Sequence, residues 1–94
     1  MHIASLTLEL HLPGCRSLKE KRGRLKPMLA QVHKKYNVSA AEIDYLDSHT
    51  ASLVACVVVS NDSRHVQQLL SQIPPWLEKR FPTLMIVEHR TELW

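Results

Sequence analysis

The sequence predicts an α+β domain in which a four-stranded antiparallel sheet carries two helices on one face. Strand-like and helix-like patterns follow one another in the order β-α-β-β-α-β. Two split βαβ crossovers with right-handed connections then give the strand order 4-1-3-2, with the doubly apolar third strand in the middle. A chain of 94 residues fits one domain, residues 1–94, with one hydrophobic core. This arrangement is the ferredoxin-like plait.

The first strand is expected over residues 2–12. Apolar side chains occupy the even positions from Ala4 to Leu12, and mostly polar ones occupy the odd positions from Ser5 to His11. This alternation is typical of a strand with one buried face. Pro13-Gly14 then ends the strand.

A helix is predicted from Ser17 to Tyr36. Ser17 and Glu20 have the spacing of a capping box, and Asn37 is a suitable C-terminal stop. Gly23 and Pro27 oppose the helix. The apolar stripe nevertheless keeps its phase across both, so we expect one helix with a bend near Pro27. The stripe consists of Leu18, Leu25, Leu29, Val32 and Tyr36.

The remaining elements alternate strand, strand, helix and strand. Strands are expected over residues 38–46, 50–60 and 83–92. A helical stripe runs from Val66 to Phe81, and Pro74-Pro75 interrupts it, which predicts a helix to about residue 73 and a kink or fresh turn to about residue 80. Because residues 53–59 are apolar at both odd and even positions, both faces of this strand are apolar, and the second face of the sheet is expected to meet a partner. A homodimer is one economical solution, and a swapped or extended edge is another.

The composition excludes several classes of protein. An apolar fraction of 45% is ordinary for a folded domain, and no apolar run approaches the length of a membrane span. The N-terminal segment alternates and lacks the pattern of a signal peptide. The two cysteines, Cys15 and Cys56, are not spaced as a CxxC pair and are expected to be reduced thiols, which favours a cytoplasmic location.

Positive charge is concentrated in the first helix. Residues 1–36 carry eight Lys or Arg against two Asp or Glu, whereas the rest of the chain carries four against seven. Such an asymmetry indicates a face for an anionic partner, with RNA or the ribosome as candidates. The plain alternative is a solvated helix face that keeps the protein soluble. The candidate nucleic-acid-binding residues are Arg16, Lys19, Lys21, Arg22, Arg24 and Lys26, and the flank of Lys19, Arg22 and Lys26 follows the helix axis as a ladder of cations.

Other readings of the polar residues are weaker. The first and third strands lack aromatic residues, so base stacking on the sheet is not expected. No catalytic or cofactor-binding motif is found, and the six histidines lack metal-ligand spacing. A cross-strand group of His2, His11 and His89 is a remote alternative. Trp76 and Trp94 are either core residues or interface anchors.

A second polar cluster lies at the start of the second helix. It consists of Asn61, Asp62, Arg64 and His65. A helix cap followed by a charged first turn explains these residues, and the alternative is a small site for an anion or a partner. The starts of the two helices are expected at opposite ends of the sheet, so they should not form one catalytic site.

Three segments together resemble the YlxP-like family of small uncharacterised bacterial proteins. They are LxLHLPxxxSLKEKR at residues 8–22, YNVSxAE at residues 36–42 and VVSNDxRHV at residues 58–66. The resemblance covers about two-thirds of the chain. It implies a ferredoxin-like fold, a bacterial cytosolic origin and genes often found beside those of translation initiation and ribosome maturation. It implies no catalytic residues.

The sequence therefore favours a non-enzymatic binding protein, an RNA- or ribosome-associated accessory factor that uses its basic first helix. Two alternatives stay open. One is a homodimeric interaction module without a nucleic-acid role, and the other is an enzyme or small-ligand site at a subunit interface.

Overall fold

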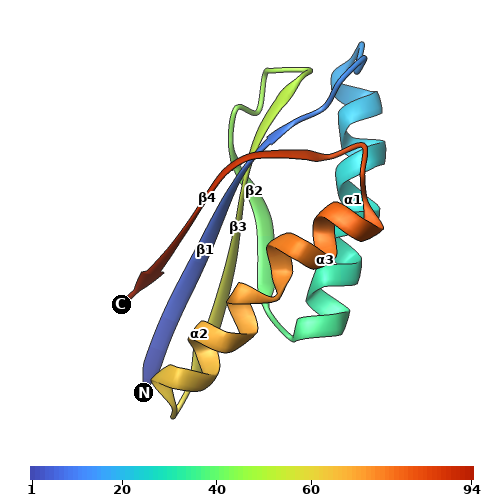
Figure 1. Ribbon diagram of the computed structural model, residues 1–94. Coiled ribbons are helices and arrows are strands. Elements are labelled where there is room, and N and C mark those ends of the chain that lie inside the picture. Colours follow the sequence, from blue (N-terminus) through green and yellow to red (C-terminus); the bar gives the residue numbers. More distant parts are fainter.

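The computed structural model describes all 94 residues and has the predicted order of elements (Figure 1). The sheet is antiparallel throughout, with the order β2-β3-β1-β4. This is the predicted order 4-1-3-2 read from the other edge, so the ferredoxin-like plait is confirmed. The elements are β1 (His2–His11), α1 (Leu18–Tyr36), β2 (Ser39–Asp44), β3 (Ala51–Ser60), α2 (Ser63–Ser71), α3 (Ile73–Arg80) and β4 (Met85–Leu93).

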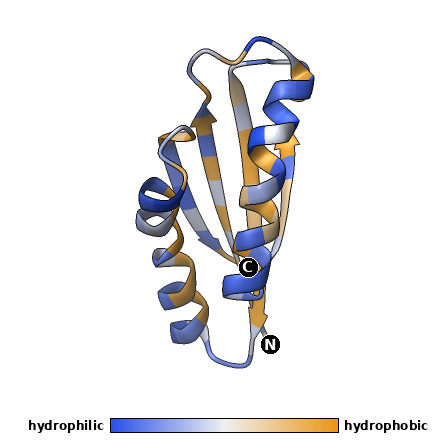
Figure 2. Cartoon of the chain, turned by 90° about the vertical axis from the view of Figure 1, so that its right-hand side faces the viewer, coloured by the Kyte–Doolittle hydropathy of each residue, from blue (hydrophilic) through white to orange (hydrophobic).

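All three helices lie on one face of the sheet, and the two chain ends lie near one end of it (Figure 1). In Figure 2 the helices lie side by side in front of the strands, and hydrophilic and hydrophobic segments alternate along them. Between the layers is a core of 18 buried side chains. The central strand β1 contributes its even positions from Ala4 to Leu10, as the alternation predicts.

The ends of α1 follow the predicted capping chemistry. The Ser17 hydroxyl accepts a hydrogen bond from the Glu20 N–H at 3.0 Å. The Glu20 carboxylate accepts from the N–H of Arg16 at 2.7 Å, one residue earlier than in the standard capping box. Asn37 ends the helix in the left-handed conformation, with φ of 53°, and Pro27 lies within the helix without ending it.

The predicted second helix is two helices that meet at Gln72. Pro74 and Pro75 lie in the first turn of α3, where their missing N–H groups would have no intrahelical partner in any case. The fresh turn expected at the proline pair is therefore a new helix.

The buried side of α1 differs from the predicted stripe. The structure buries Lys21, Leu25, Met28 and Val32 completely, whereas Leu29 is only half-buried. At 100° per residue, this turns the buried direction by about 40° toward Lys21. A lysine therefore occupies a core position that an apolar pattern does not reveal.

The opposite face of the sheet is uncovered. Val57 and Val59 of β3 are 40% and 62% exposed on it. Trp94 is 73% exposed, and its indole N–H donates to the Ser5 hydroxyl of β1 at 2.9 Å. None of the helices combines the length and the hydropathy that a membrane crossing requires.

Candidate nucleic-acid interface

The cation ladder of α1, defined as Lys19, Arg22 and Lys26, lies at the surface. All three side chains are exposed, and none forms an ion pair within the chain. Their spacing of three and then four residues places them on one side of the helix. At a rise of 1.5 Å per residue, the first and last Cα atoms lie about 10 Å apart. The ladder can thus contact successive phosphates of one strand.

A shallow hollow of about 150 Å³ runs beside this ladder. It lies between α1 and the edge strand β2, and is lined by Arg22, Leu25, Lys26, Leu29 and Glu42. Farther along the helix, Lys34 and Lys35 are exposed and likewise unpaired with any carboxylate. The exposed charge of α1 is therefore positive along most of its length.

Lys21 does not belong to this surface, and its sequence-based assignment as a nucleic-acid contact is wrong. Its side chain is 1% exposed, and its ammonium lies 2.8 Å from Glu42 Oε2. The ammonium also donates to the carbonyl oxygens of Tyr45 at 2.8 Å and Ala51 at 3.1 Å. With all three of its protons engaged, Lys21 cannot reach a phosphate.

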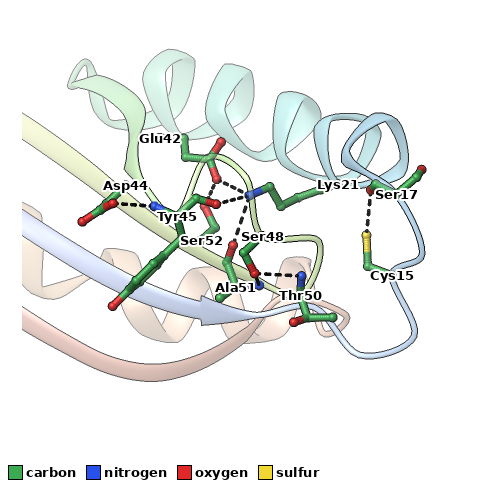
Figure 3. A network of polar contacts seen from close by, with 10 residues as sticks. All are labelled: Cys15, Ser17, Lys21, Glu42, Asp44, Tyr45, Ser48, Thr50, Ala51 and Ser52. Atoms are coloured by element: carbon green, nitrogen blue, oxygen red, sulfur yellow. Dashed lines mark hydrogen bonds and ion pairs between the residues drawn. The ribbon is translucent and has the colours of Figure 1, made fainter.

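These contacts connect α1 to the β2–β3 hairpin (Figure 3). Glu42 Oε2 also accepts from the Ser52 hydroxyl of β3 at 2.7 Å. Tyr45 has a φ of 60°, rare for a residue with a side chain, and its carbonyl also accepts from the N–H of Ser48 at 3.0 Å. The strained turn thus presents a carbonyl to Lys21, and the whole network fixes the helix against the hairpin.

Arg24 and Glu20 form a local pair that reduces the free charge at the start of α1. Arg24 Nη2 lies 3.2 Å from Glu20 Oε1, and its Nη1 donates to the Pro13 carbonyl at 3.0 Å. The backbone N–H of Arg16 and the Arg24 guanidinium hold the pKa of Glu20 below its ordinary value. Arg24 is therefore occupied, whereas the guanidinium of Arg16 stays exposed and without a carboxylate partner.

The second polar cluster forms a helix cap. Asp62 is the N-cap of α2, and its carboxylate accepts from the Arg64 N–H at 2.9 Å. Asn61 and the side chains of Arg64 and His65 are exposed. Capping explains the position of Asp62, and an anion site at this end of α2 stays a prediction. α1 and α2 begin at opposite ends of the sheet, as expected (Figure 1).

The remaining candidates are dispersed. His2 and His11 lie at opposite ends of β1, and His89 pairs with Leu8, so the three imidazoles do not come together. Cys56 lies in the core, and burial raises the pKa of its thiol to about 11. Trp94 lies on the open sheet face, which the sequence did not indicate. Trp76 lines a groove between α1 and α3 that the sequence also did not reveal, because it joins residues 31–35 to residues 76–80.

Two comparisons by sequence agree with each other. The family described as "Protein of unknown function (DUF503)" matches residues 3–91. The "Uncharacterized protein YlxP" of Bacillus subtilis (strain 168) is 34% identical over 76 residues, which is 81% of this chain and 82% of that protein. The range matched by the family model includes all three segments from which the family resemblance was predicted.

Similar solved structures support the fold alone. A variant of SnoaB, a cofactor-independent oxygenase from Streptomyces nogalater, has a TM-score of 0.54 at 12% identity, covering 99% of this chain and 90% of that one. A de novo designed protein with a ferredoxin fold has a TM-score of 0.52 at 14% identity, covering 98% and 85%. At identities this low, a shared fold does not show a shared activity.

Proposed function

The chain belongs to the DUF503 family of proteins of unknown function and is YlxP-like, and we propose that it is a cytoplasmic, non-enzymatic binding protein that contacts RNA through the exposed basic side of α1. The observation that carries the proposal is the unpaired ladder of Lys19, Arg22 and Lys26. RNA on the ribosome is the partner that this surface fits best, because it presents closely spaced phosphates in a fixed shape.

The distribution of acids supports this choice. Glu20 is the only acidic residue in α1, and it is already engaged by Arg24 and by the Arg16 N–H. Glu42, which borders the hollow beside the ladder, is engaged by Lys21 and Ser52. The nearby carboxylates thus have partners of their own, and the ladder cations are left for an external anion.

Such binding should be strongly salt-dependent and weakly sequence-specific. Each cation that displaces a counterion adds about 0.7 to 0.9 to the slope of log K against log salt concentration. Three ladder contacts would therefore account for a slope of about −2 to −3. Phosphate contacts fix position rather than sequence, so RNAs of different sequence and similar shape should bind alike.

The test is charge reversal of the ladder. In a variant carrying Lys19→Glu, Arg22→Glu and Lys26→Glu, we expect RNA binding in a filter or anisotropy assay to be lost and the far-UV circular dichroism to be unchanged. The side chains are exposed and make no ion pair, so their replacement leaves the core intact. If the variant binds ribosomal RNA as tightly as the parent does, the proposal is wrong.

A matched control separates the surface from the net charge. The exposed cations Lys79 and Arg90 lie on α3 and β4, and the exposed, uncharged Gln67 and Gln68 lie on α2. Their replacement by Glu changes the formal charge by the same amount as the ladder variant does. The control should keep most of its RNA affinity, because the altered charges lie off the ladder.

The uncovered sheet face favours a second candidate, a homodimeric interaction module without a nucleic-acid role. Its occupant would be a second copy of the chain. Strands of six to ten residues in a four-stranded sheet give a face of roughly 30 by 19 Å, or about 600 Å² in projection. That approaches the roughly 800 Å² of accessible surface that each partner buries in a standard interface.

Sedimentation analysis tests the dimer. A concentration-dependent dimer should be weakened by Val59→Lys on the open face and kept by Gln68→Lys on the exposed side of α2. A chain that stays monomeric at every concentration would exclude the dimer.

A further inference from the structure

A groove of about 460 Å³ lies on the other side of α1 from the hollow beside β2. It is lined by Gln31, Lys34, Lys35, Trp76 and Arg80, and so joins the second half of α1 to α3. Three cations and one aromatic ring line it, and no carboxylate does. This combination suits a ligand that has both a phosphate and a flat ring.

The aromatic wall of the groove is held in place by its neighbours. The Trp76 ring is half-buried and makes edge contacts with Tyr36 at 5.6 Å and with Phe81 at 5.8 Å between ring centroids. A clamped ring loses little conformational entropy when a ligand stacks on it. Trp76 therefore offers a rigid surface at the edge of the core.

The cations around Trp76 are available to an anion. Arg80 Nε donates to Gln31 Oε1 at 3.1 Å, which orients the guanidinium and leaves its two terminal nitrogens for a ligand. Lys34 and Lys35 are exposed, and Lys35 lies 5.7 Å from the centroid of the Tyr36 ring. Neither lysine has an acidic partner within the chain.

We propose that this groove binds an unpaired nucleotide of a single-stranded RNA segment, with its base against Trp76 and its phosphate between Lys34, Lys35 and Arg80. The inference deepens the proposed function and rests on it. A paired base is stacked inside a helix and cannot reach the ring, whereas every unpaired base has a face that an aromatic side chain can stack on.

The two surfaces together specify the kind of RNA. Lys34 lies on the outward side of α1, between the cation ladder and the groove. A strand that follows the ladder can therefore cross α1 at Lys34 and place its next base in the groove. The preferred ligand is a junction or loop, in which a structured phosphate backbone continues into unpaired nucleotides.

Tryptophan fluorescence tests the groove directly. In a Trp94→Phe background, Trp76 is the only indole, because the chain has two tryptophans. Oligoadenylate of ten nucleotides should quench its emission, and a blunt duplex at equal phosphate concentration should not. Quenching by the single strand supports the groove, and emission that neither RNA changes overturns it.

Substitutions then measure the contribution of stacking. Trp76→Leu should weaken oligoadenylate binding by about 5- to 100-fold, as removal of a stacking aromatic does, and change duplex binding by less than twofold. The surface variant Lys34→Gln/Lys35→Gln keeps the aromatic cluster and should also weaken the single strand more than the duplex. Equal losses for both RNAs would overturn the groove.

The outcomes also separate this inference from the proposed function. If ladder reversal abolishes duplex binding and Trp76→Leu leaves oligoadenylate binding unchanged, the proposal for the groove is wrong and the proposed function of the ladder is supported. If ladder reversal has no effect on RNA binding while oligoadenylate still quenches Trp76, the proposal for the groove is supported and the proposed function of the ladder is wrong. Failure of both RNAs to bind the parent protein overturns both.

Discussion

Replacement of Lys21 by Met tests whether the buried network of α1 is structural. The substitution keeps most of the aliphatic stem and removes the ammonium, which lies 2.8 Å from Glu42 and from the Tyr45 carbonyl and 3.1 Å from the Ala51 carbonyl. Glu42, whose side chain is 15% exposed, then keeps a charge that only the Ser52 hydroxyl compensates.

The expected loss of stability is large for a chain of this size. Removing one member of a buried ion pair costs about 3 to 5 kcal/mol, because the remaining charge stays desolvated. In a domain of this length, 1 kcal/mol moves the melting temperature by about 4 to 8 °C, so a decrease of at least about 12 °C is expected. Thermal unfolding followed by circular dichroism measures it.

Two further variants complete the experiment. Lys21→Met/Glu42→Gln removes the orphaned charge as well and should recover about half of the lost stability, since the Tyr45 and Ala51 carbonyls still lose the hydrogen bond from Lys21. Lys19→Met, at an exposed position two residues before Lys21, should change stability by less than about 0.5 kcal/mol. The reasoning fails if Lys21→Met costs less than about 1 kcal/mol, or if the double variant is no more stable than the single one.

Three other predictions follow from the local structure. Ser17→Ala removes the hydroxyl that caps α1 and should cost about 1 kcal/mol in urea unfolding; an unchanged midpoint would contradict this role. Gly23→Ala should stabilise the chain by about 1 kcal/mol, because an added Cβ meets nothing within 4 Å; a loss of stability would show that the helix needs glycine there. The raised pKa of the Cys56 thiol, about 11 when folded against about 9 when exposed, contributes stability that is complete below pH 9 and is lost as the pH rises to 11. The stability difference between the parent and Cys56→Ala should therefore shrink over that range by about 2 to 3 kcal/mol, and a constant difference would refute the assignment.

The order of elements was predictable because each carries its own periodicity and local stop signals. The alternation from Ala4 to Leu12, the Ser17 cap and the Asn37 stop all depend on neighbours within a few residues, and the structure confirms each of them. The proline pair at Pro74 likewise marked where α3 begins. Local chemistry was thus sufficient for the elements and their order along the chain, and the handedness of the crossovers supplied the strand order.

The site was only partly predictable, because charge alone does not tell a surface cation from a buried one. Lys21 and Arg22 both flank the apolar stripe in the sequence pattern, and only the partner separates them. Glu42 lies 21 residues farther along the chain, and the Ala51 carbonyl lies 30 residues away. The groove was invisible for the same reason, since Gln31 and Arg80 meet across 49 residues.

The burial of Lys21 makes the basic side of α1 easier to interpret. A cation that stabilises the hairpin and a cation that awaits a phosphate make opposite predictions, because loss of the first lowers stability and loss of the second lowers affinity. Lys21→Met, assayed at a temperature where it stays folded, should bind RNA within twofold of the parent. The ladder variant should instead keep its melting temperature and lose its RNA. The two measurements together therefore assign four of the eight basic residues of the first 36 positions, Lys21 to structure and the three ladder cations to recognition.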